Sequence, residues 1–314
     1  MRLRKLRYLP FVARRAAVRA FPTLPKLRPD RLAVAVLARR HPDRYVFVDW
    51  NPRDRNWGDA LNRSLVEHLT ERRSLSSRLV LRPRGVGHYV VVGSVLGMNS
   101  LDGSVIWGAG FMTESDVPRG VPDDVAALRG PLSAELLGRD GIHIPADVAF
   151  GDPAILMPLI YRPLTRPRYT LGVVPHYADA QDPRLAEYHS HPDVLVIDVT
   201  QGTRTFIDQL SECRIVASSS LHGIIAADAY GLPRVWVEFG DRVTGAGFKF
   251  RDYAAGARLE GHPETALGFT TRISSLLDAA NRYPIDKELQ GDLLRCCPLP
   301  IAPPVERRLL AALA

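Results

Sequence analysis

The feature that most constrains the fold is an alternation of short β-rich runs with helical patterns, which occurs on both sides of one interruption. The interruption is the Pro- and Arg-rich stretch Met157–Arg168. Strands that alternate with helices are typical of parallel sheets covered by helices, and the length of 314 residues leaves room for two domains. We therefore expect an α/β protein with domains at 33–160 and 169–290, joined by a linker at 161–168.

The expected elements come from apolar runs and helical periodicity. The strands are Tyr45–Asp49, Arg78–Leu81, Tyr89–Val92 and Val105–Trp107, then Thr170–Val174, Val194–Ile197, Arg214–Ala217 and Val235–Glu238. The helices are Asp59–Arg72, Leu132–Leu137, Arg204–Leu210, His222–Tyr230 and Thr265–Ala280. We expect 291–314 to be a C-terminal tail. Because such pairs of domains bind ligands in the cleft at the carboxyl ends of their strands, the loops that follow strands are where a site is expected.

The positive charge of the chain is concentrated at its N-terminus. Residues 1–32 contain eight Arg and two Lys against Asp30, a charge of +9, so the remainder carries −2 of the chain's total of +7. A nearly neutral body argues against an enzyme of nucleic acids, which needs basic residues across a folded face. The segment 1–32 also mixes apolar residues with its cations, which suits either contact with an anionic membrane surface or a solvated basic arm.

The sequence contains neither a secretory signal nor a run of the roughly 18 apolar residues that a spanning helix needs. Its three cysteines, Cys213, Cys296 and Cys297, lack the spacing of a zinc site or a disulfide framework. We therefore expect a cytoplasmic protein with no metal, and place it at the inner face of the membrane if the segment 1–32 binds lipid.

The most informative segment is Cys213–Pro233, CRIVASSSLHGIIAADAYGLP, in which an apolar strand leads through three serines into a helix of small residues. Any of Ser218, Ser219 and Ser220 can cap this helix, and the N–H groups of its first turn can bind an anion. His222 would lie in that turn and face the cleft. A buried, hydrogen-bonded histidine on a capped helix is the structural alternative.

The segment Asn56-Trp57-Gly58-Asp59 occupies the equivalent place in the first domain. Asn56 or Asp59 can cap the following helix, and Gly58 permits a close approach of the backbone. Glycines also follow two strands, in Gly93-Ser94 and in Trp107-Gly108-Ala109-Gly110. Because no GxGxxG precedes a helix, a dinucleotide site is not indicated.

Cationic or titratable side chains stand at further strand ends. Arg129 precedes a helix that begins at Pro131, and His176 ends the first strand of the second domain. Lys249 lies in the polar cluster Gly245–Tyr253, whose glycines predict a mobile loop. These groups, with Asp59 as a base, suit proton transfer on an anionic small substrate.

These motifs, in this order, resemble those of the polysaccharide pyruvyl transferase family. The matching segments are NWGD, GSVLG, VIWGAG, LRGPLSAELL, GDPAIL, VPHY, SSSLHGIIAADAYGLP and FKFRDY. The resemblance spans Asn56 to Tyr253, and it looks like the bacterial exopolysaccharide members that place a pyruvate ketal on a hexose.

The resemblance implies a fold similar to glycosyltransferase-B enzymes, with two Rossmann-like domains facing across a cleft. It implies transfer of pyruvate from phosphoenolpyruvate to two hydroxyls of one sugar, in an exopolysaccharide or its lipid-linked precursor, with release of phosphate. No cofactor beyond the donor is implied.

The resemblance also suggests roles for particular residues. His222 and Arg129 match ligands of phosphoenolpyruvate, and His222 is the leading general acid. Many members carry Arg before the Leu-His pair where this chain has Ser220, so Lys249 or Arg251 would replace that cation.

The remaining roles are assigned from position. We place Asp59 as the base for the sugar hydroxyls. Donor binding is assigned to Arg129, Ser219, Ser220, Leu221, His176 and Lys249, and acceptor binding to Asn56, Trp57, Gly58 and Trp107.

Two other functions fit the same sequence. A sugar-nucleotide glycosyltransferase shares the expected architecture, and Glu238, after the strand Val235–Val237, is in the place of a ribose-binding carboxylate. The second alternative is a non-catalytic protein that binds carbohydrate.

Overall fold

The computed structural model describes residues 34, 36–38, 40–50, 56–79, 86–240, 242–245, 247–270 and 272–313. The N-terminal segment 1–32 lies outside these residues, so the prediction of membrane contact is untested by the fold. Within the described part of the chain, no helix is long and apolar enough to cross a membrane.

The first half of the chain forms a parallel sheet of six strands in the order β2-β1-β3-β4-β5-β6. The strands are β1 (Tyr45–Val48), β2 (Arg73–Ser76), β3 (His88–Val90), β4 (Ser104–Trp107), β5 (Asp124–Leu128) and β6 (Ala149–Phe150). The helical segments are α3 (Trp57–Thr70), α4 (Pro131–Arg139), the 3₁₀ helix η3 (Pro153–Leu156) and α5 (Met157–Ile160).

The second half forms a parallel sheet of five strands in the order β11-β10-β9-β7-β8. The strands are β7 (Tyr169–Val174), β8 (Val194–Val196), β9 (Cys213–Ser218), β10 (Arg234–Glu238) and β11 (Leu267–Gly268). The helices are α6 (Leu185–Ser190), α7 (Thr203–Ser211), α8 (Leu221–Ala229), α9 (Phe248–Gly256), α10 (Ile273–Asp278), α11 (Lys287–Arg295) and α12 (Pro303–Leu313).

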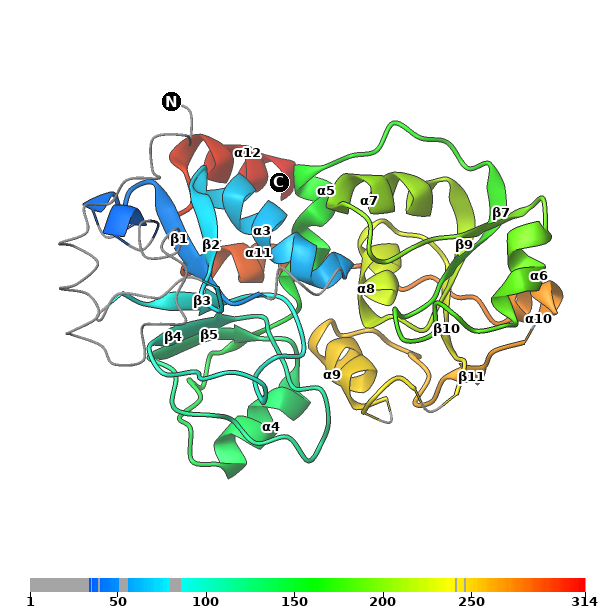
Figure 1. The fold of residues 1–314 in the computed structure, drawn as a ribbon. Coiled ribbons are helices and arrows are strands. Elements are labelled where there is room, and N and C mark those ends of the chain that lie inside the picture. The colour runs from blue at the N-terminus through cyan, green and yellow to red at the C-terminus, as the bar shows by residue number, and fades with distance from the viewer. Residues whose placement is uncertain are drawn as a thin grey trace, which may run out of the picture.

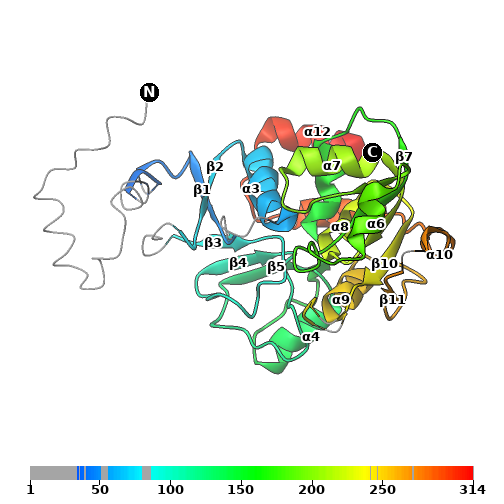
Figure 2. The ribbon, with the colours of Figure 1, turned by 45° about the vertical axis from the view of Figure 1, so that its right-hand side comes forward.

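The prediction of an α/β fold with parallel sheets is confirmed. Figures 1 and 2 show the two sheets at opposite ends of the molecule, with α3, α7 and α8 between them. One cluster of buried apolar side chains runs without a break from α3 across to α7 and α8, and it includes Leu61, Phe206 and Ile224. The two halves therefore share a core, and the domain boundaries proposed from the sequence stay a prediction.

Local amphipathicity explains the position of α3. Leu61, Leu65, Val66 and Leu69 are all fully buried, as their helical spacing predicts. Asn56 caps this helix, because its Oδ1 accepts a hydrogen bond of 2.8 Å from the Gly58 amide.

Three local predictions are wrong. The chain forms a strand at Arg73–Ser76, and Arg78 and Leu79 of the strand expected at Arg78–Leu81 lie in the turn that follows, whereas residues 80 and 81 lie outside the described residues. The helix expected at Thr265–Ala280 is reduced to α10, preceded by β11.

The third error is the loop expected at Gly245–Tyr253. From Phe248 onward this segment is helix α9, of which Phe248, Phe250 and Tyr253 are buried. Its burial against α4 explains why a segment with a weak helical pattern is ordered.

The end of the chain does not extend away from the body, as a tail would. Helices α11 and α12 contact each other and pack against elements of the first half, with α11 on β6 and η3 and α12 on α3 and α5. Trp107 Nε1 donates to the carbonyl of Leu293 at 3.0 Å. Residues 291–313 therefore help to bury the first sheet.

Candidate functional site

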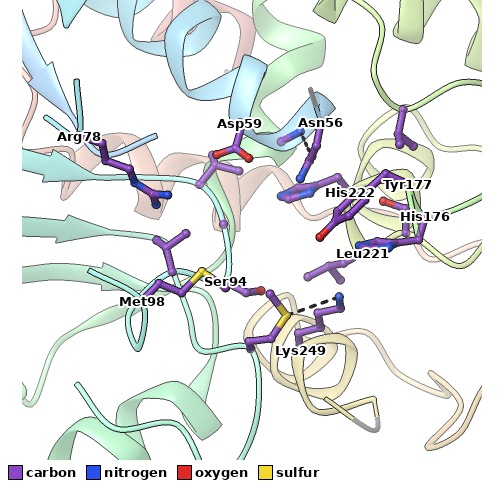
Figure 3. A pocket seen from close by; sticks show the side chains of 17 residues that line it. Asn56, Asp59, Arg78, Ser94, Met98, His176, Tyr177, Leu221, His222 and Lys249 are labelled. Atoms are coloured by element: carbon purple, nitrogen blue, oxygen red, sulfur yellow. Dashed lines mark hydrogen bonds between the residues drawn. The ribbon is translucent and has the colours of Figure 1, made fainter. Parts of the chain in front are cut away.

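A pocket lies where loops at the carboxyl ends of strands from both sheets meet (Figure 3). Because all strands in each sheet are parallel, these loops emerge at one edge of that sheet. The pocket is lined by Asn56, Gly58, Asp59, Arg78, Val92, Gly93, Ser94, Val95, Met98, Met112, His176, Tyr177, Val199, Ser220, Leu221, His222 and Lys249.

The N-terminus of α8 forms one wall of the pocket. Ser220 is the N-cap residue, but its side chain makes no capping hydrogen bond, so the prediction of a serine side-chain cap is wrong. The Ser218 hydroxyl instead donates to the backbone and accepts from the Ser220 amide at 3.0 Å. The N-terminal turn of α8 is therefore not closed by a serine side chain, and its positive end faces the pocket.

His222 lies in that first turn and reaches across to α3. Its ring packs so tightly on Gly58 that a Cβ atom built there would lie 2.1 Å from Cε1 of the imidazole. The Nε2 atom is buried and makes no hydrogen bond in the described structure. Burial, followed by the positive charges of Lys249, Arg129 and His176, lowers the pKa of His222 to about 3. The imidazole of the free protein is therefore neutral at pH 7.

Lys249 enters the pocket from α9. Its side chain is only 5% exposed, and its Nζ lies 3.8 Å from the sulfur of Met112. Burial and the nearby Arg129 lower the pKa of Lys249 to about 8, against the opposing effect of Asp179. The pocket thus contains a buried ammonium whose direct polar partner is a thioether, a weak acceptor.

His176 follows β7 and lines the same side of the pocket. The backbone amide of Ala178 donates to its Nδ1 at 3.2 Å, which leaves Nε2 as the protonated nitrogen of the neutral ring. Burial, then the charge of Lys249, lowers the pKa of His176 to about 4.

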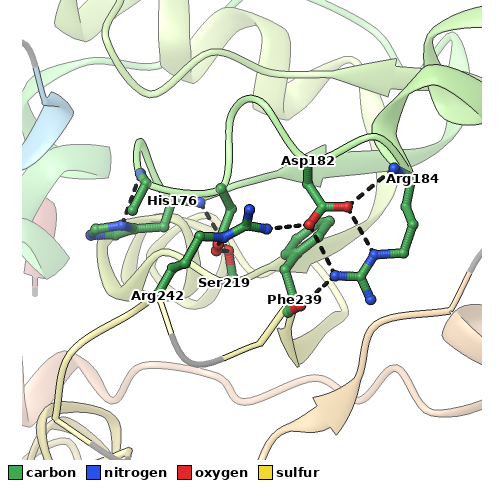
Figure 4. A network of polar contacts seen from close by, with 8 residues as sticks. His176, Asp182, Arg184, Ser219, Phe239 and Arg242 are labelled. Atoms are coloured by element: carbon green, nitrogen blue, oxygen red, sulfur yellow. Dashed lines mark hydrogen bonds and ion pairs between the residues drawn. The ribbon is translucent and has the colours of Figure 1, made fainter.

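A polar network holds the loop that carries His176 (Figure 4). Ser219 Oγ accepts from the His176 amide at 2.9 Å and donates to Asp179 Oδ2 at 2.7 Å. Arg242 Nε donates to the other oxygen of Asp179 at 3.2 Å.

The network continues to Asp182. Arg242 and Arg184 both pair with this carboxylate, and the Arg184 contacts measure 2.8 and 3.0 Å. Ser219, predicted as a donor ligand, therefore does not line the pocket and instead fixes the backbone of His176.

The N-terminus of α3, against which His222 packs, supplies a second wall of the pocket. Asn56, Gly58 and Asp59 line the pocket, as predicted. Asn62 anchors this helix to the strand-end loop after β3, because its amide exchanges two hydrogen bonds of 2.9 Å with the backbone of Val92.

Arg129 is not among the residues that line the pocket, although its role was predicted as a donor ligand. Its guanidinium is completely buried and donates to Asp252 Oδ2 at 2.9 Å, to Ser94 Oγ at 2.6 Å and to the Phe111 carbonyl at 2.6 Å. Of these partners Ser94 lines the pocket. Arg129 therefore affects the site indirectly, by orienting Ser94 and by the electrostatic effect of its positive charge.

The two tryptophans expected at the acceptor are core residues. Trp57 and Trp107 are fully buried, and their indole N–H groups donate to the carbonyls of Thr203 and Leu293. Neither lines the pocket. The indoles are large apolar side chains whose single donor is satisfied inside the protein, which explains their burial.

Several lining residues were missed from the sequence. Arg78 was expected in a strand but lies in a turn. Met98 and Met112 carry no motif that distinguishes them, and Tyr177 was given no role. The proximity of Tyr177 to His176 in VPHY was the available signal.

The carboxylate of the alternative nucleotide site is not found here. Glu238, the carboxylate suggested for a nucleotide ribose, does not line the pocket. Among the described residues, no group of His, Cys, Asp and Glu could hold a metal ion.

The comparisons with known proteins agree with the motifs. Residues 122–240 match the family described as polysaccharide pyruvyl transferase. This match begins before Arg129, ends after Glu238 and includes His176 and His222. This part of the chain is therefore similar to the polysaccharide pyruvyl transferase family, as the resemblance indicated.

Two relatives extend the likeness. The chain is 24% identical over 253 residues to the succinoglycan biosynthesis protein ExoV of Rhizobium meliloti, covering 76% of this chain and 72% of that protein. It is 29% identical over 216 residues to an uncharacterized protein of Acanthamoeba polyphaga mimivirus, covering 66% of this chain and 73% of the viral protein.

The solved structure of an uncharacterized protein of Klebsiella pneumoniae is also similar, and the match covers 75% of this chain and 96% of the Klebsiella chain. The identity is 14% and the TM-score 0.43.

Proposed function

We propose that this chain transfers a pyruvyl group from phosphoenolpyruvate to two hydroxyls of one sugar, forming a cyclic ketal and releasing phosphate. The observation that carries the proposal is that Lys249, His222 and the N-terminus of α8 surround one pocket. A buried ammonium and a helix N-terminus both stabilise an anion, and phosphoenolpyruvate carries a phosphate and a carboxylate. The family match supports a pyruvyl transferase, and the name of ExoV supports an exopolysaccharide as acceptor.

The reaction requires an acid for the donor and a base for the sugar. A proton adds to C3 of phosphoenolpyruvate, and C2 becomes electrophilic. One sugar hydroxyl adds to C2 and loses its proton, the C2–O bond to phosphate breaks, and the second hydroxyl closes the ketal as its proton leaves. We assign the proton on C3 to His222 and the base to Asp59, which follows the Gly58 on which the His222 ring packs.

The low pKa of His222 gives this acid a switch. The imidazole of the free protein is neutral, and a dianionic phosphate beside it favours the imidazolium. Arrival of the donor thus supplies the protonated acid only when there is a substrate to protonate.

On this proposal the two sheets correspond to the Rossmann-like halves of a glycosyltransferase-B-like enzyme, and the substrates meet in the cleft between them. The acceptor is part of an exopolysaccharide or its lipid-linked precursor. The basic residues 1–32 would then hold the enzyme at the inner face of the cytoplasmic membrane. Flotation with anionic vesicles tests this part, and equal partitioning of the full chain and a chain that starts at Leu32 would contradict it.

The function itself is tested by phosphate release from phosphoenolpyruvate in the presence of candidate sugars. We expect release that depends on the sugar, with a mass gain on the sugar of one pyruvate less one water. His222→Ala should abolish release, and the exposed His143→Ala should leave it unchanged. The proposal would be overturned in favour of a glycosyltransferase if sugar nucleotides raised the thermal stability of the protein and no sugar supported phosphate release from phosphoenolpyruvate.

A further inference from the structure

Tyr177 is a large aromatic side chain that stands exposed at the pocket. It is 56% exposed and lines the pocket beside His176. The two rings lie 4.1 Å apart between centroids and are tilted by 36°, so the imidazole supports one side of the phenol. Figure 3 shows the ring of Tyr177 reaching into the pocket. An exposed aromatic face at the rim of a pocket is a feature of binding sites.

Across the pocket from Tyr177 lies Arg78 (Figure 3). Its Nε donates to Asp49 Oδ1 at 2.6 Å, and Nη2 approaches Oδ2 at 3.4 Å. Asn99 Nδ2 donates to the same carboxylate at 3.0 Å, and Asp49 is buried. The guanidinium is therefore held in one orientation.

The ion pair with Asp49 also makes Arg78 electrostatically different from Lys249, the cation at the other end of the pocket. Asp49 balances the charge of Arg78, whereas the direct polar contact of Lys249 is a thioether. An anion is therefore stabilised more strongly beside Lys249 than beside Arg78. The N–H groups that Arg78 does not give to Asp49 suit uncharged oxygen atoms such as hydroxyls.

Resting on the proposed function, we propose that Tyr177 and Arg78 form the acceptor subsite and bind a pyranose ring. One face of a pyranose presents C–H groups and packs on the open face of the phenol, while hydroxyls at the ring edge accept hydrogen bonds from Arg78. This subsite takes the place of Trp57 and Trp107, which are buried. Arg78 lies on the far side of the pocket from Lys249, whereas Tyr177 lies beside His176 on the same side as Lys249. A sugar held between Tyr177 and Arg78 would therefore lie next to His222 and Asp59, where it meets the donor.

The kinetic test compares Tyr177→Ala, Tyr177→Phe and Leu164→Ala. Because stacking contributes modestly, Tyr177→Ala should raise the KM for the sugar about three- to tenfold with kcat and the donor KM unchanged. Tyr177→Phe retains the ring and should resemble the natural protein. Leu164 is 98% exposed and outside the pocket, so its substitution controls for loss of surface apolar area. An unchanged sugar KM in Tyr177→Ala, or an equal rise in the donor KM, would overturn the proposal.

A binding measurement separates this proposal from the proposed function. Saturation-transfer NMR with methyl β-D-glucopyranoside and methyl β-D-galactopyranoside needs no turnover. We expect at least one sugar to receive magnetisation from the natural protein, and to receive less from Tyr177→Ala and Arg78→Lys. If this holds while no pyruvyl transfer is found, the proposed function fails and the subsite stands. Equal signals from the natural protein and both variants, or no signal from either sugar, would overturn the subsite.

Discussion

Arg129 and Asp252 form a buried ion pair that joins the two halves of the chain, with Arg129 Nε 2.9 Å from Asp252 Oδ2. The Asp252 carboxylate also accepts from the amide and the hydroxyl of Ser133, at 2.9 and 2.6 Å. The backbones approach closely at this point, since a Cβ on Gly130 would lie 1.8 Å from the Asp252 carbonyl oxygen. The motifs LRGPLS and FKFRDY therefore meet, and they hold α9 where Lys249 reaches the pocket.

Asp252→Ala should lower the free energy of unfolding by about 3–5 kcal/mol, because it leaves the buried guanidinium of Arg129 without its anion. Urea unfolding measures the change. The matched control is Arg63→Ala, which removes an exposed i,i+4 pair with Glu67 and should cost less than about 1 kcal/mol. Equal effects of the two substitutions would show that the buried pair does not hold the halves together.

Gly58→Ala should impair activity, although alanine is the better helix former by about 1 kcal/mol. The new Cβ would meet the His222 ring at 2.1 Å, so the imidazole must move. We expect a fall of at least tenfold in kcat/KM for phosphate release. Gly138→Ala in α4 is the control, since nothing lies within 4 Å of its Cβ, and it should raise the thermal midpoint with activity unchanged. Full activity of Gly58→Ala would exclude a need for this ring position.

The elements that follow simple periodicity were predictable from the sequence. The burial of Leu61 and Leu65, the strand β9 and the helix that begins beside His222 all follow from apolar spacing. The cap of Asn56 follows from the preference of its side chain for the N-cap position. The pocket was placed correctly at strand ends because parallel strands direct their following loops to one edge.

The long-range contacts were beyond the sequence alone. Nothing in LRGPLS shows that Arg129 is paired with Asp252, 123 residues later, so its charge was assigned to a ligand. Trp57 and Trp107 were misplaced for the same reason, because the carbonyls that satisfy their N–H groups come from distant loops. Helix α9 was missed because its stability comes from packing rather than from its own pattern.

The histidines make stability sensitive to mild acid. The pKa values of His222, His176 and His262 are lowered to about 3, 4 and 4, chiefly by burial. Unfolded imidazoles bind protons below about pH 6.5, so between that pH and 4 the unfolded chain binds more protons than the folded one. As the pH is lowered through this range, the free energy of unfolding should therefore decrease by about 1 kcal/mol per pH unit for each such group.

His222→Gln removes one of these groups and should reduce that slope by about 1 kcal/mol per pH unit between about pH 6 and 4.5. Chemical denaturation at a series of pH values measures it. The exposed His143→Gln should leave the slope as it is, and a slope unchanged in His222→Gln would contradict the burial of a neutral imidazole.

Lys249 should make donor binding depend on pH on the alkaline side. Its pKa is lowered to about 8 by burial and by Arg129, so the free enzyme loses the ammonium above that pH. Since kcat/KM reports ionisations of the free enzyme, kcat/KM for phosphoenolpyruvate should fall about tenfold per pH unit above pH 8. Lys249→Met keeps the apolar stem and removes the charge, and it should raise the donor KM and abolish this limb. Lys287→Met, at an exposed lysine of α11, should retain it. An alkaline limb that survives in Lys249→Met would assign the titration to another group and remove Lys249 from the donor site.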